Sequence, residues 1–320
     1  MKDIFLLITA CLLAGCSSDS GTRPSPVVKS VPHQEAWGIY ALDLSSEDVA
    51  LIYSTSRAIH GLNLSGQNQK LAFAQKVGGD TDANFEIMTV GAGGTGLTQL
   101  TNNSIMDVYP SFSPDGSQIA FLSQGTTLDI YIMNADGTGR QLLYDSGYHD
   151  ADVDWGNGGR IVFTRNSQIW TIKDDGTDAL QLTNPLHAGE WGVANLPIGD
   201  YDPRFNSDGS RVVFDRLVDT SQQNGGYNIY TINLGGTGET QLTSTTYAQG
   251  FPNWSSANIQ IAYIVAAISG AGKYDMYLMN ADGTNNRTIT PSYFPAEFLC
   301  HNAVFSNDDA KVYFVGQWYQ

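Results

Sequence analysis

The sequence has 320 residues, with 16 basic against 32 acidic side chains and a formal net charge of −16. Nucleic-acid binding is disfavoured, because each phosphate approached would add Coulomb repulsion instead of releasing counterions, and docking on anionic lipid by charge alone is disfavoured for the same reason. The length suits one large or two medium domains, and the 34 Gly residues with few Lys, Glu and Arg indicate many short strands joined by turns.

Residues 1–15 have the pattern of a secretory signal peptide. An apolar run from Ile4 to Leu13 is too short to span a bilayer but fits the central region of such a signal. The stretch Leu12–Cys16 resembles the bacterial lipobox, and this resemblance implies cleavage before Cys16, acylation of Cys16 and firm membrane anchoring. Ser17 stands where an Asp would favour the inner membrane, so we expect an outer-membrane address in the bacterial cell envelope. The alternative is a secretory signal whose Cys is incidental.

Residues 16–36 are expected to form the acylated Cys and a flexible tether. They are rich in Ser, Gly and Pro and contain almost no large apolar side chains. Fully stretched, twenty such residues reach up to about 65 Å. Cys300 is the one thiol left in residues 37–320, so no disulfide framework can stabilise that part and core packing must do so.

A repeat of 43 to 51 residues fills residues 37–320. Its clearest copy is Tyr109–Phe121, in which a Ser-Pro-Asp-Gly turn separates an aromatic anchor from a β-rich triplet. A third apolar strand, a Gly turn and a short polar strand follow in each unit. The anchors are Leu64, Phe112, Trp155, Phe205, Trp254 and Phe305. Four strands per unit of this length predict the blade of a β-propeller.

The two ends of the repeat predict how the ring closes. The C-terminal part supplies an inner strand near Val304 and a second strand at Val312–Val315. Ile39–Leu42 and Val49–Tyr53 resemble the missing third and fourth strands. Five whole units and two halves predict an all-β, six-bladed propeller of four-stranded antiparallel blades, with the N- and C-terminal strands sharing one blade.

The repeated pattern Phe-Ser-Pro-Asp-Gly…Ile-Ala-Phe…Ile-Tyr-x-Met-Asn-Ala-Asp-Gly…Leu-Thr resembles the WD40-like repeat of TolB-type propellers. The resemblance covers about residues 37–320 and implies a propeller without the α/β domain that precedes it in TolB. It also implies a setting in the envelope, facing the periplasm or the exterior.

One face of the propeller is expected to carry the function, because its loops are long and irregular whereas the opposite turns are short and follow the motif. These long loops lie at 74–84, 144–150, 184–200, 215–228, 264–275 and 291–302. Trp191, on one of the longest, either contacts a ligand or covers the edge of a neighbouring blade.

The position five residues before each anchor opens the innermost strand at the mouth of the central channel. It is occupied by Ile59, Asp107, Asp150, Asp200, Gln249 and Cys300. Adjacent carboxylates repel unless a cation intervenes, so Asp107, Asp150 and Asp200 suggest a Ca²⁺ site or a seat for an inserted Lys or Arg. In the alternative, each Asp bonds the backbone of the next blade.

Three histidines stand beside this ring: His60, His149 and His301. Imidazoles could join Asp150 as ligands of a transition metal. Some TolB-like propellers are metal-dependent lyases of uronic-acid oligomers, and the resemblance therefore implies an oligogalacturonate-lyase-like enzyme as an alternative function. No local metal-binding spacing supports it, and each His can equally bond a neighbouring residue.

We therefore predict a binding or scaffold module for a protein, peptide or glycan, which meets the long-looped face and the channel mouth. The candidate contact residues are Asp107, Asp150, Asp200, Gln249, His149, His301 and Trp191. Tyr148, Tyr201, Tyr293 and Phe294 are expected nearby, and an acidic, aromatic rim suits a basic or aromatic ligand. No catalytic pairing occurs that would favour an enzyme.

Overall fold

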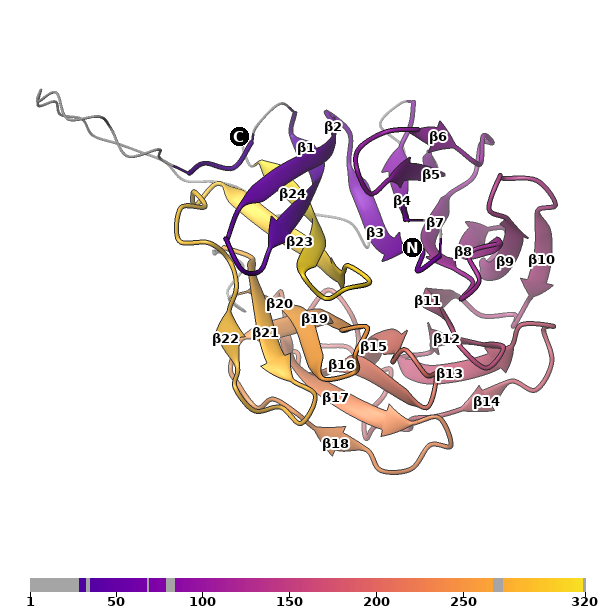
Figure 1. The fold of residues 1–320 in the computed structure, drawn as a ribbon. Helices are drawn as coiled ribbons and strands as arrows, with labels where there is room; N and C mark the ends of the chain where they lie inside the picture. The colour runs from indigo at the N-terminus through magenta and orange to yellow at the C-terminus, as the bar shows by residue number, and fades with distance from the viewer. Residues whose placement is uncertain (1–28, 33–34, 68, 79–83, 267–272, 319–320) are drawn as a thin grey trace, which may run out of the picture.

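The computed structural model describes residues 29–32, 35–67, 69–78, 84–266 and 273–318. The predicted signal peptide and the acylated Cys16 lie outside these residues, as does most of the predicted tether. Six separate four-stranded antiparallel sheets surround a common axis (Figure 1). The predicted six-bladed, all-β propeller is confirmed. In the described part of the chain no helix is long and apolar enough to cross a bilayer.

Each blade runs from an innermost strand at the axis to a short outermost strand. Blade 1 comprises β3 (Ile59–Leu64), β4 (Lys70–Lys76), β5 (Phe85–Gly91) and β6 (Thr98–Gln99). Blade 2 comprises β7 (Asp107–Phe112), β8 (Gln118–Gln124), β9 (Leu128–Asn134) and β10 (Gln141–Tyr144). Blade 3 comprises β11 (Asp150–Gly156), β12 (Arg160–Arg165), β13 (Gln168–Lys173) and β14 (Leu180–Gln181).

The remaining blades follow the same order. Blade 4 comprises β15 (Gly199–Phe205), β16 (Arg211–Asp219), β17 (Gly226–Asn233) and β18 (Thr240–Gln241). Blade 5 comprises β19 (Ala248–Trp254), β20 (Gln260–Ala266), β21 (Asp275–Asn280) and β22 (Arg287–Thr288). The closing blade comprises β23 (Phe298–Phe305), β24 (Lys311–Trp318), β1 (Trp37–Asp43) and β2 (Val49–Thr55).

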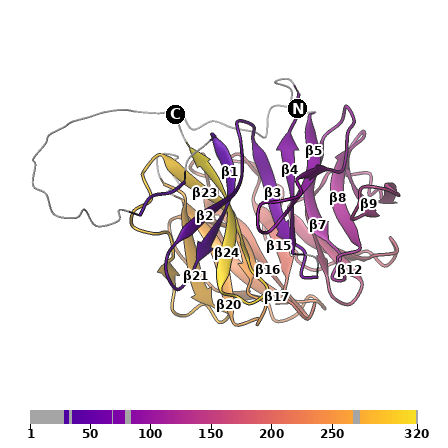
Figure 2. The same ribbon diagram turned by 45° about the horizontal axis from the view of Figure 1, so that its top comes forward.

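The closing blade joins the two ends of the chain as predicted. Strand β1 lies antiparallel between β24 and β2, with Ile39 opposite Val315 and Leu42 opposite Val312 (Figure 2). The Tyr40 and Phe314 rings are fully buried in this blade and stack with centroids 5.5 Å apart. On the other side of the junction, β23 contacts β3, so the six innermost strands form a closed ring.

A β-bulge interrupts every innermost strand at the same place. Three residues before each anchor the backbone has a positive φ, and the pairing with the second strand shifts there. The six residues are Gly61, Tyr109, Asp152, Asp202, Phe251 and Asn302. A bulge re-aims side chains and often lies beside a functional site. Simple alternation along the strand therefore does not predict which side chains reach the middle of the ring.

Buried apolar triplets on the second strands form the contacts between blades. Phe73, Phe121, Phe163 and Phe214 are all fully buried. The Gly of the predicted turn before the fourth strand is required for two reasons, as Gly137 shows. Its φ is +88°, and an added Cβ would lie 2.8 Å from the Leu100 carbonyl oxygen of the neighbouring blade.

Candidate functional site

A cavity of about 330 Å³ opens among the long loops, and we call it the acidic pocket. Its floor comes from the bulged residues of four neighbouring innermost strands: Tyr109, Asp152, Asp202 and Phe251. Its walls come from the loop before β15, the β16–β17 connection and the first residues of β19. The face with long loops therefore also carries this cavity.

Three carboxylates line the acidic pocket: Asp152 and Asp215, which are buried, and Asp202, which is partly buried. Asp152 is 7% exposed and Asp215 is 1% exposed. Oδ2 of Asp215 accepts a hydrogen bond from the Phe251 backbone N–H at 3.1 Å, whereas its Oδ1 accepts none from a described N–H or O–H group. Asp152 Oδ2 accepts a longer hydrogen bond, of 3.4 Å, from the Asp202 backbone N–H.

Burial changes the acidity of these carboxylates. It raises the pKa of Asp202 to about 8, with a further contribution from the Asp152 charge, while Arg204 acts in the opposite direction. The pKa of Asp215 is raised well above its ordinary value, first by burial and then by the charge of Asp202. The cluster therefore holds at least one proton near neutral pH, because closely placed like charges cannot all ionise in a poorly solvated site.

Aromatic rings make up much of the remaining lining. Tyr109, Tyr201, Tyr227, Phe251 and Tyr274 all border the acidic pocket. Burial raises the pKa of Tyr109, Tyr201 and Tyr227, so their hydroxyls stay neutral. The Tyr201 hydroxyl donates to the Pro197 carbonyl at 2.7 Å, which fixes its ring against the loop before β15. Carboxylates under aromatic walls form a site for a cationic or an aromatic group.

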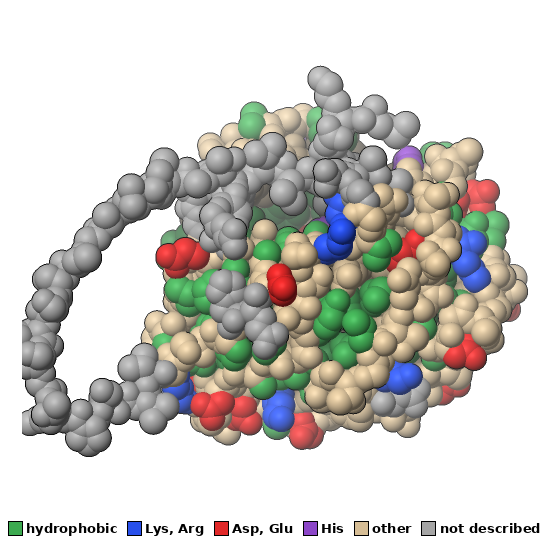
Figure 3. Space-filling view, turned by 90° about the horizontal axis from the view of Figure 1, so that it is seen from above, with side chains coloured by type: hydrophobic (Ala, Val, Ile, Leu, Met, Phe, Trp, Pro, Cys, Tyr) green, Lys and Arg blue, Asp and Glu red, His purple; other side chains and the backbone are tan. Residues whose placement is uncertain are grey.

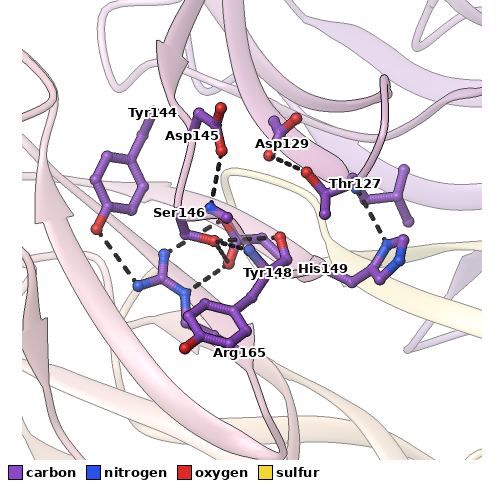
Figure 4. Close-up of polar contacts among 11 residues, drawn as sticks. Thr127, Asp129, Tyr144, Asp145, Ser146, Tyr148, His149 and Arg165 are labelled. Atoms are coloured by element: carbon purple, nitrogen blue, oxygen red, sulfur yellow. Dashed lines mark hydrogen bonds and ion pairs between the residues drawn. The ribbon is translucent and has the colours of Figure 1, made fainter.

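The predicted aspartates at the start of the innermost strands are held within their own blades. Arg165, labelled in Figure 4, donates from its Nε to Asp150 at 2.8 Å, and Arg216 Nε donates to Asp200 at 2.5 Å. These partners lie on the second strand, directly opposite the aspartates in the register. The partners are thus side chains of the same blade and not the backbone of the next one.

Asp107 is also satisfied inside its blade, by the Ser123 hydroxyl and by Asn103 Nδ2 at 2.7 Å. Arg140 lies farther away, with 3.7 Å between Nη2 and the Asp107 carboxylate. No group of three or more His, Cys, Asp or Glu side chains in the described residues is placed to hold a metal ion. The structure therefore does not bring the three predicted Ca²⁺ ligands together.

The histidines fall into two places. His60 and His301 both lie against the Trp37 ring, with centroids at 6.2 and 5.8 Å, where the closing blade meets blade 1. Burial lowers the pKa of each to about 4, so both imidazoles are neutral at neutral pH. His149 lies apart from them, and its Nδ1 accepts from the Leu128 N–H at 3.2 Å (Figure 4). The three are not gathered around Asp150.

Of the other predicted contact residues, Gln249 lines the acidic pocket. Trp191 is 66% exposed, so most of its side chain faces solvent. Its loop is held to the β16–β17 connection by the Val193 N–H, which donates to the Thr220 carbonyl at 2.7 Å. Phe294 is instead buried in the core of the closing blade.

Tyr148 and Tyr293 lie elsewhere on the long loops. Tyr148 is about half exposed, whereas the Tyr293 hydroxyl donates to the Glu47 carbonyl at 2.6 Å. On the face seen in Figure 3, acidic and basic side chains are interspersed with uncharged ones. What sets the acidic pocket apart is therefore its local group of carboxylates, not the net charge of the chain.

Sequence reasoning missed Asp152, Asp202 and Asp215. The first two lie two residues beyond the mouth position that was compared across blades. Asp215 could have been found by comparing the residue that follows each buried triplet. That position is Ala74, Leu122, Thr164, Asp215, Ile264 and Val315, so blade 4 alone carries a charge there.

Comparisons with known proteins agree with this fold. No protein-family model matches the sequence. The Tol-Pal system protein TolB of Francisella tularensis subsp. mediasiatica is 25% identical over 301 residues, which is 87% of this chain and 64% of that protein. The chain thus spans less than two thirds of the length of this curated relative.

Solved structures show the same architecture. A TolB structure from Agrobacterium tumefaciens superposes with a TM-score of 0.66 at 15% identity, covering 89% of this chain and 99% of that one. An oligogalacturonate lyase in complex with manganese superposes with a TM-score of 0.51 at 10% identity, covering 91% and 99%, a likeness that shows the fold alone. This chain is a distant homologue of the TolB proteins and carries a TolB-like six-bladed β-propeller.

Proposed function

We propose that this protein is a binding module of the bacterial cell envelope, which holds a protein, peptide or glycan at its long-looped face over the acidic pocket. The observation that carries the proposal is the place of this pocket. It lies at the meeting point of four innermost strands, on the face with long loops, and is lined by five aromatic side chains. Rigid aromatic rings around a concave site are typical of binding surfaces.

The setting in the envelope is supported by two independent observations. The distant TolB relatives are named as proteins of the Tol-Pal system. The lipobox-like stretch before Cys16 favours a protein anchored by lipid, at the outer membrane. Incorporation of labelled palmitate into the wild type but not into Cys16→Ser would support the anchor. Equal labelling of both would contradict it.

Affinity capture from an envelope extract tests the binding function. Ala248 borders the acidic pocket, and Ala248→Trp should fill it with a large ring whatever the charge of the ligand. The matched control is Gly235→Trp in a turn of the opposite face, where an added Cβ meets no described atom within 4 Å. We expect the wild type and the control to capture the same partner and Ala248→Trp to lose it. The same capture by all three would overturn the proposal.

A further inference from the structure

We propose that the acidic pocket takes an organic cation: the ammonium or guanidinium head of its ligand lies among Asp152, Asp202 and Asp215. The inference rests on the proposed binding function and names the chemistry of the group that the pocket receives. It concerns carboxylates other than the aspartates that open the innermost strands, since those are already engaged within their own blades.

The charge balance of the pocket is the first support. Three carboxylates from three strands act on one another, namely Asp152 of β11, Asp202 of β15 and Asp215 of β16. Within the described residues, Arg204 is the one basic side chain that acts on this group, and its Nη1 already donates to the Pro203 carbonyl at 2.7 Å. A ligand cation would relieve the remaining repulsion.

The second support is an unused hydrogen-bond acceptor. Asp215 is 1% exposed and borders the pocket, and its Oδ1 accepts no hydrogen bond from a described N–H or O–H group, although its carboxyl also interacts with that of Asp202. A buried polar atom left unsatisfied costs about 1–3 kcal/mol, and such atoms are rare in folded proteins. An N–H donor on a bound cation would satisfy this oxygen after a small shift of the neighbouring side chains.

The aromatic lining of the pocket favours an organic cation over a metal ion. Tyr109, Tyr227, Phe251 and Tyr274 present aromatic rings, which attract ammonium and guanidinium groups by their faces. Ca²⁺ needs six to eight oxygen ligands, and no metal-ligating group of three occurs in the described residues. A cavity of about 330 Å³ is at the small end for ligand sites, so it suits one basic side chain or a small amine.

Binding of a cation should be coupled to proton release. The groups that face Asp202 are Asp152, Arg204 and Asp215, with the neutral hydroxyls of Tyr109 and Tyr227 beside them. A cation favours the ionised carboxylates, so the proton that the cluster holds passes to the buffer when the ligand enters. Affinity should therefore rise with pH through about 8, where Asp202 itself ionises.

Isothermal titration calorimetry with defined probes tests this inference. The probes are N-acetyl-lysine methylamide, spermidine and the uncharged N-acetyl-norleucine methylamide. We expect the two cations to bind saturably and the norleucine derivative not to bind. Titrations in two buffers of different ionisation enthalpy should show proton release. Tighter binding of the lysine derivative would indicate that the natural ligand is a side chain of a macromolecule. Tighter binding of spermidine would indicate that the natural ligand is a free amine. Either order supports the inference.

A charge-removing variant supplies the control. Asp202→Asn with Asp215→Asn should weaken the binding of the cationic probes at least tenfold, whereas Asp208→Asn, in an exposed turn of the same blade, should leave it unchanged. Equal binding of the norleucine derivative, absence of proton release in the wild type, or unchanged binding by the double variant would overturn the inference. The proton-release measurement needs no variant, so it stands even if the double variant folds poorly.

The capture experiment separates the two proposals. If Ala248→Trp loses the partner while the double Asn variant retains it, the proposed binding function is supported and the inferred cation site is wrong. If neither variant loses the partner, the binding function itself fails.

Discussion

The ion pair between Asp150 and Arg165 predicts that the three aspartates at the channel mouth do not contribute equally to stability. We call these residues the mouth aspartates: Asp107, Asp150 and Asp200. Both partners are buried, with side-chain exposures of 0% and 6%. The guanidinium also lies 5.0, 4.9 and 5.0 Å from the ring centroids of Tyr144, Phe163 and Trp170. Asp150→Ala leaves this buried cation without its carboxylate, and breaking a buried pair in this way costs about 3–5 kcal/mol.

The other two aspartates leave better-compensated partners behind. After Asp200→Ala, Arg216 keeps both oxygens of Glu239, each at 2.8 Å. After Asp107→Ala, Arg140 is already one third exposed and can be solvated. Each of these substitutions should cost about 1–3 kcal/mol, the usual range for an unsatisfied buried polar group.

A double substitution tests whether the unpaired Arg165 charge causes the loss of stability in Asp150→Ala. Burial raises the pKa of Asp150 to about 6, against the lowering effect of Arg165, so the folded state gains little from the ionised pair as a whole. Asp150→Asn with Arg165→Met removes both charges and keeps much of the apolar packing. It should recover most of the stability that Asp150→Ala loses.

Urea unfolding followed by circular dichroism measures these differences, with excess Ca²⁺ and with a chelator. We expect Asp150→Ala to unfold at the lowest urea concentration and Ca²⁺ to change no midpoint. Equal midpoints for the three single variants would refute the ion-pair reasoning. A midpoint raised by Ca²⁺ in the wild type alone would instead restore the Ca²⁺ site predicted from the sequence.

Three further outcomes follow from the described residues. Phe314→Ala, in the fully buried core of the closing blade, should cost about 3–5 kcal/mol in urea unfolding, and a loss below 1 kcal/mol would contradict tight closure. Burial lowers the pKa of His301 from its ordinary 6.5 to about 4, so the unfolded chain takes up a proton at a higher pH than the folded chain. The free energy of unfolding should therefore fall as the pH is lowered from 6.5 to 4, and His301→Gln should flatten that slope in urea unfolding. Gly209 has φ +74°, and an added Cβ would lie 2.1 Å from the Asn157 carbonyl oxygen, so Gly209→Ala should lower the free energy of unfolding by about 1–3 kcal/mol. Gly235→Ala should change it by almost nothing, because an added Cβ there meets no described atom within 4 Å.

The partners of the mouth aspartates show why a comparison along the chain was not enough. The equivalent positions of the blades repeat along the chain, whereas the residue opposite each of them lies on the second strand at a separation that varies between blades. Asp150 lies opposite Arg165, and Asp200 lies opposite Arg216. Such pairs depend on strand register, which a β-bulge shifts within the same strand. The expected acidic rim is therefore largely a set of ion pairs inside blades.

The amino-acid sequence by itself determined the blade number, the strands of each blade and the closure by β1 and β24. Those features repeat at a regular interval and follow from local chemistry: Asp-Gly turns, β-rich triplets and Gly before the fourth strand. Only the tertiary structure decided which side chains meet at the axis. Asp152, Asp202 and Asp215 come from three strands, and bulges with positive φ turn the first two into the pocket. A cluster made by neighbouring blades has no local pattern, because its members share a place in the ring and not a spacing in the chain.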